Sequence, residues 1–215
     1  MRALVAFLLL FVGSAHAQTE VPFSDADVLA HAELAQWLKL WTPPLSDLRA
    51  SSFRLRSQSD TIHWPIDHFA SGSSAFPPWH MERLVYSPDS TWAADMWFFQ
   101  VDSSGQFLGE VDSHVGVLNR LNGQAYEIVN CGTVCGSHAV IWLGASTLLV
   151  CGWEECFDDP PGRVRPAVSR YELQEQREQQ FEGPPLRQEY LESVNSAVRQ
   201  IWRVRYPWLR FEQSN

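Results

Sequence analysis

Two segments carry side chains of the kinds that enzymes and metal centres use. Asp112, Ser113 and His114 are the residue types of a hydrolase triad, but adjacent residues on a strand point to opposite faces and cannot form one among themselves. Residues 63–68 hold two imidazoles and a carboxylate that could bind a metal, but Pro65 breaks the helical spacing that would align the two rings. We therefore assign no catalytic residue, no metal site and no cofactor.

Three single residues are candidates for binding. Asp95 lies in the middle of a predicted strand, on the face that carries Trp97, and a buried carboxylate there needs an arginine or a backbone N–H as partner. The alternative role of Asp95 is a purely structural hydrogen bond. Ten tryptophans are present, and Trp64 and Trp79 lie in a long loop where their rings could stack on a ligand.

The chain has four cysteines, an even number that favours disulfides in an oxidising compartment: Cys131, Cys135, Cys151 and Cys156. A zinc site with the spacings Cys-x3-Cys and Cys-x4-Cys is the alternative.

Hairpin register distinguishes the possible disulfide pairings. If Leu143 pairs with Thr147, Cys135 faces Glu155 and lies beside Cys156. The register therefore favours a Cys135–Cys156 bridge, which leaves Cys131–Cys151 as the second. Local bridges 131–135 and 151–156 are the alternative pattern.

The first seventeen residues predict where the protein goes. Arg2 is followed by an apolar run over 3–12, and Gly13 to Ala17 supplies the small residues of a cleavage site, which together are typical of a secretory signal peptide. We expect a periplasmic or secreted protein. This apolar run is too short to span a bilayer, and no second segment approaches the ~18 apolar residues of a membrane-spanning helix.

Length and charge limit the class of protein. Residues 18–215 suffice for a single globular domain. The formal net charge of −9 argues against nucleic acid as a partner. It is compatible with a cationic protein partner, or with solubility alone.

Helical patterns lie at both ends of the chain, and strand patterns lie between them. Helix is predicted for 25–41, beginning with a Ser24–Asp27 capping box, and for 186–205. Strands follow from residue 82 onward, and Asn122-Gly123 predicts a hairpin turn between two of them. A further hairpin is plausible for 53–56 with 61–64. The fold class is therefore α+β, with an antiparallel meander of about eight strands flanked by the two helices.

A weak internal repeat spans residues 82–182. Residues 84–97 align with 140–153, and both segments contain a strand, a tight turn and a strand. With its Ser87-Pro88-Asp89 turn, this region resembles two blades of a β-propeller of the Tol-associated type. Two blades cannot close a ring. An open meander is therefore expected.

These features lead to three hypotheses for function. The first is an exported, non-enzymatic module that binds or inhibits another protein, and a cationic partner would fit its charge. The second is glycan or cell-wall binding through Trp64 and Trp79. The third is a hydrolase whose site is assembled from dispersed residues.

Overall fold

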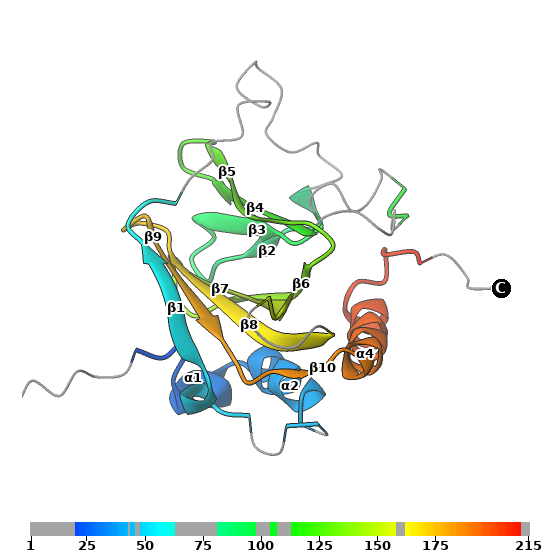
Figure 1. Ribbon diagram of the computed structural model, residues 1–215. Coiled ribbons are helices and arrows are strands. Elements are labelled where there is room, and N and C mark those ends of the chain that lie inside the picture. The colour runs from blue at the N-terminus through cyan, green and yellow to red at the C-terminus, as the bar shows by residue number, and fades with distance from the viewer. Residues whose placement is uncertain are drawn as a thin grey trace, which may run out of the picture.

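Two antiparallel sheets form the centre of the molecule, and helices lie beside the larger sheet (Figure 1). The computed structural model describes residues 20–42, 44–45, 48–62, 81–97, 104–106, 113–157 and 162–211. The fold is α+β with antiparallel sheets, as the sequence predicts. The expected signal peptide, 1–17, lies outside the described residues.

The large sheet has six strands and the small sheet has four. The large sheet has the spatial order β1 (Arg54–Ser59), β9 (Arg177–Glu182), β8 (Arg163–Glu172), β7 (Thr147–Glu155), β6 (Cys135–Trp142), and β10 (Leu186–Arg187) also pairs with β8. The small sheet has the order β2 (Val85–Tyr86), β3 (Trp92–Asp95), β4 (Ser113–Asn119), β5 (Ala125–Cys131). The helical elements are α1 (Asp25–Ala30), α2 (Ala32–Leu40), the 3-10 turn η1 (Ala50–Ser52) and α4 (Glu189–Arg205).

The N-terminal helix begins as predicted but is broken in the middle. The hydroxyl of Ser24 accepts a hydrogen bond from the backbone N–H of Asp27, whose carboxylate accepts one from the Ser24 N–H, so the capping box is confirmed. His31 has extended backbone angles and divides the expected helix 25–41 into α1 and α2. The break gives the two helices separate roles: α1 buries no residue, whereas α2 buries Leu34, Trp37 and Leu38.

The first strand pairs with a distant partner. β1 pairs with β9, so the hairpin expected between 53–56 and 61–64 is wrong for the strand Arg54–Ser59. Alternating polar side chains predict a strand equally well whether its partner is local or distant, and in this protein the distant partner supplies the pairing. Similarly, Leu186–Arg187 forms β10 instead of starting the C-terminal helix.

The β6–β7 hairpin contains a bulge. The Leu143 N–H donates to the Thr147 carbonyl at 2.9 Å, which confirms the expected turn. The register then shifts between Ser137 and Ala139, because His138 is an extra residue in β6. As a result Cys135 faces Glu154.

The core extends over both faces of β7. Leu148 and Val150 lie on the face toward the small sheet, and Leu149 and Cys151 lie on the opposite face; all four are buried. No described helix is both long and apolar enough to cross a lipid bilayer.

Candidate functional site

A cleft of about 530 Å³ lies between the two sheets. Large side chains close one end, where the hydroxyl of Tyr171 on β8 donates to the Ile128 carbonyl oxygen on β5 at 2.7 Å. Farther along the large sheet the lining residues are Gly152, Ala167 and Ser169. Because these side chains are small, the sheets enclose space there.

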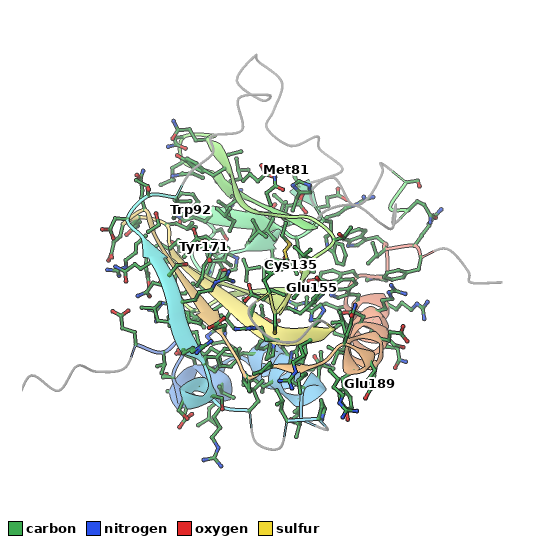
Figure 2. The ribbon with its side chains drawn as sticks, in the orientation of Figure 1. Met81, Trp92, Cys135, Glu155, Tyr171 and Glu189 are labelled. Atoms are coloured by element: carbon green, nitrogen blue, oxygen red, sulfur yellow. A yellow bond between two sulfur atoms is a disulfide. The ribbon has the colours of Figure 1, made fainter. Side chains whose placement is uncertain are left out.

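A disulfide lies on the wall of this cleft, beside Glu155 at the open end of the β6–β7 hairpin (Figure 2). It joins Cys131 at the end of β5 to Cys135 at the start of β6, with 5.8 Å between the Cα atoms. The structure therefore differs from the expected bridges Cys135–Cys156 and Cys131–Cys151, and it leaves Cys151 and Cys156 as free, buried thiols.

Two features of the fold explain this pairing. The bulge at His138 moves Cys135 from Glu155 to Glu154, one residue farther from Cys156. Cys151 lies on the face of β7 that points away from the cleft, because side chains alternate along a strand and Gly152 and Glu154 line the cleft. Cys131 is on the cleft side and cannot reach it.

Charged groups from four strands line the cleft. Glu127 on β5 pairs with His114 Nδ1. A carboxylate oxygen of Glu154 on β7 lies 2.7 Å from Nη1 of Arg56 on β1. Glu178 on β9 lies 3.1 Å from the Tyr171 hydroxyl. Among the residues that the structure describes, the lining thus has three carboxylates and one guanidinium, and each carboxylate is held in place by a neighbour.

Burial raises the pKa of two cleft residues, Glu154 and Tyr171. Desolvation raises the pKa of Glu154 above its ordinary value, although Arg56 and Arg165 partly oppose the shift. Desolvation, followed by the nearby charge of Glu178, raises the pKa of Tyr171 well above 10. Tyr171 therefore stays neutral and keeps its proton for the Ile128 carbonyl at physiological pH.

A buried ionic network lies beside the cleft. The guanidinium of Arg165, whose side chain is only 6% exposed, pairs with Glu182. Its Nε–H donates to the sulfur of Cys156 at 3.0 Å. Arg54 also pairs with Glu182, so this carboxylate lies between two guanidinium groups. A buried ion pair such as Arg165–Glu182 is stabilised when each partner also makes a hydrogen bond to a further group, as both do in this network.

No family model, no curated protein and no solved structure matches this chain. Function is therefore inferred from the residues of the cleft.

The sequence-predicted binding residues lie elsewhere. Asp95 is fully buried at the end of β3, where its carboxylate accepts a hydrogen bond from the Trp97 N–H at 2.8 Å. It is not among the cleft-lining residues, and this bond is the structural role named as its alternative. Trp64, Trp79 and residues 63–68 lie outside the described part of the chain.

Sequence reasoning missed the polar residues of the cleft. Arg56 on β1 and Glu178 and Gln180 on β9 line the cleft. On β9 a period of two places polar residues on one face, whereas on β1 the register shifts between Leu55 and Ser57, so Arg56 is an extra residue whose face does not follow from alternation. The pattern was visible in the sequence, but it is also that of a solvent-facing strand.

Proposed function

We propose that this chain is an exported binding protein whose cleft takes a cationic segment of another protein. One observation supports it: a cleft of about 530 Å³ whose lining, in the part of the chain that the structure describes, holds three carboxylates and one guanidinium. A low-dielectric cleft with an excess of one charge attracts ligands of the opposite charge. The net charge of −9 extends this field beyond the cleft and favours encounter with a basic partner.

Replacing Glu178 with glutamine tests the proposal directly. Gln keeps the size of the side chain and removes one negative charge from the cleft. We expect the affinity for an arginine-rich peptide, followed by tryptophan fluorescence or calorimetry, to fall about fivefold to tenfold, roughly 1–1.4 kcal/mol. The loss should shrink as salt is added, because screening weakens the interaction.

Glu175→Gln is the matched control. Glu175 lies in the β8–β9 turn, is exposed, and does not line the cleft, yet its substitution changes the net charge equally. We expect it to leave peptide affinity nearly unchanged. Equal losses in the two variants would mean that overall charge, not the cleft, binds the peptide, and the proposal would be wrong.

A neutral glycan is the alternative ligand. Uncharged polar residues, among them Ser137, Ser169 and Gln180, line the cleft beside its charged groups, and hydroxyl and amide side chains can hydrogen-bond to sugars. Cell-wall oligosaccharides should be titrated beside the peptide. Glycan binding that is unaffected by Glu178→Gln and by salt would favour this alternative.

As the pH is lowered, peptide binding should begin to weaken at a higher pH than the ordinary pKa of glutamate predicts. The pKa of Glu154 is raised chiefly by burial, so this carboxylate gains its proton at a higher pH than an exposed one. Each carboxylate that is neutralised removes attraction for a cation. Affinity measured from pH 7 downward should begin to fall above the ordinary pKa of glutamate. In Glu154→Gln the onset should move to lower pH, and an unchanged onset would contradict the assignment.

A further inference from the structure

A free thiol lies close to the disulfide of the cleft wall. Cys156 follows β7 directly, and its N–H donates to the Arg163 carbonyl at 3.0 Å, so the pairing of β7 with β8 continues through this residue. It is 6% exposed and is not part of a disulfide. The pairing therefore fixes which way Cys156 points.

Register places Cys156 on the same sheet face as Cys135. Cys135 is directly opposite Glu154, and Glu154 is directly opposite Arg165. Side chains two apart on a strand share a face, so Cys156 is on the face of Glu154. The 3.0 Å hydrogen bond from Arg165 to the Cys156 sulfur agrees with this placement. Cys135 and Cys156 are therefore diagonal neighbours across the β6–β7 pair.

The separation is close to what a disulfide spans. Diagonal neighbours lie about 7–8 Å apart, and disulfides join Cα atoms up to about 6.8 Å apart. Both cysteines are at the open end of the hairpin, where β6 begins and β7 has ended. A Cys135–Cys156 bridge therefore requires a backbone movement at that end of the hairpin.

We propose that Cys156 and the Cys131–Cys135 disulfide form a thiol–disulfide exchange site. Cys156 gives its proton to solvent, and its sulfur attacks the sulfur of Cys135. The bond between Cys131 and Cys135 breaks, and Cys131 leaves as a thiolate that takes up a proton. One disulfide and two thiols are present before and after, so no oxidant or reductant is consumed.

Arg165 supports the attacking sulfur. Its Nε–H donates to Cys156, and a cationic donor of this kind stabilises negative charge on sulfur. Glu182 holds the same guanidinium from the other side and fixes its position. Cys151 takes no part, because it lies on the opposite face of β7.

The exchange changes what the disulfide connects. The Cys131–Cys135 bridge ties β5 of the small sheet to β6 of the large sheet at the cleft. A Cys135–Cys156 bridge instead lies wholly at the end of the large sheet and frees the end of β5. This inference concerns the covalent state of the cleft wall and does not depend on which ligand the cleft binds.

Cys131→Ser in the full chain, exported and left unreduced, tests the exchange. We expect a Cys135–Cys156 disulfide, which removes two of the three remaining thiols from alkylation and leaves Cys151. Cleavage after glutamate separates Cys156 from the other cysteines, because Glu154 and Glu155 precede it. Trypsin does not, since there is no Lys or Arg between Arg120 and Arg163. Fragment sequencing assigns the partner of Cys156.

Cys151→Ser is the matched control and should keep the wild-type linkages. A folded Cys131→Ser protein in which Cys135 and Cys156 are both alkylated would overturn the proposal. If that variant does not fold, the wild type is equilibrated with a trace of reduced glutathione at about pH 8, where thiolate is available. A peptide joining Cys135 to Cys156 should then form, and its absence would overturn the proposal equally.

Discussion

Replacing Gly152 with alanine should lower the free energy of unfolding by about 3 kcal/mol or more, or prevent folding. Gly152 lies within β7, with β6 and β8 on its two sides, beside the bulge at His138. A Cβ atom at this position would be 3.0 Å from the carbonyl carbon of Gly136 and closer still to its oxygen. Because these are backbone atoms of the paired strand, the hairpin cannot yield without breaking its ladder.

Gly144→Ala is the control for this substitution. Gly144 is in the β6–β7 turn, and the nearest atom to a Cβ there is the Thr147 hydroxyl at 3.9 Å. Its unfolding free energy, measured by urea denaturation, should change by less than about 1 kcal/mol. Similar midpoints for the two variants would show that the close approach of β6 and β7 is not required.

Acid should destabilise the protein by about 3 kcal/mol through one buried imidazole, as the pH falls from about 6.5 to about 4. Desolvation lowers the pKa of His138 from 6.5 to about 4, although its hydrogen bond to Asn195 partly opposes the shift. The unfolded chain therefore binds this proton at a higher pH than the folded one. The contribution is fully present above pH 6.5 and is lost as the pH falls through the folded pKa.

The surroundings of His138 explain why protonation affects the whole fold. Its Nε2 lies 2.8 Å from the Asn195 side-chain oxygen on α4, and its ring stacks on Trp41, which follows α2. Its carbonyl accepts a hydrogen bond from the Trp202 indole at 2.9 Å. The charged groups that line the adjoining cavity, Glu33 and Arg205, pair with each other at 2.8 Å.

His138→Gln separates this imidazole from other acid-sensitive groups. Glutamine can still donate to Asn195 but does not titrate, so the variant should lose less stability than the wild type between pH 7 and about pH 4. His31→Gln, at the junction of α1 and α2, is the control and should follow the wild type. Parallel pH dependences for wild type and His138→Gln would contradict the role of this residue.

Local signals in the sequence predicted the elements whose partners are near in the chain. Asn122-Gly123 predicted the β4–β5 turn, and Gly123 has the positive φ of 75° that such a turn requires. The capping box predicted the start of α1. In both cases the residues that determine the structure lie within a few positions of each other. The resemblance to propeller blades stays a prediction.

Features that depend on distant residues were not predictable. The bulge at His138 moved Cys135 by one position relative to β7, and a single-residue shift was enough to change the expected disulfides. The pairing of β1 with β9 and the assembly of the cleft from Arg56, Glu127, Glu154 and Glu178 depend on how two sheets meet. Alternation within each strand says which residues share a face, but not which faces meet.

The pairing of β1 with β9 also affects the order in which the chain can fold. Arg54 and Glu182, which join these strands, are 128 residues apart, so β1 has no partner until most of the chain has emerged. Pairings of such long separation are slow to form, because a large loop must close first. Until that loop closes, β1 and one edge of β9 both lack their partner, and open strand edges pair readily with other chains. We therefore expect the protein to be most prone to aggregation between its synthesis and the pairing of β1 with β9. A chaperone that binds unfolded chains would protect it most during that time.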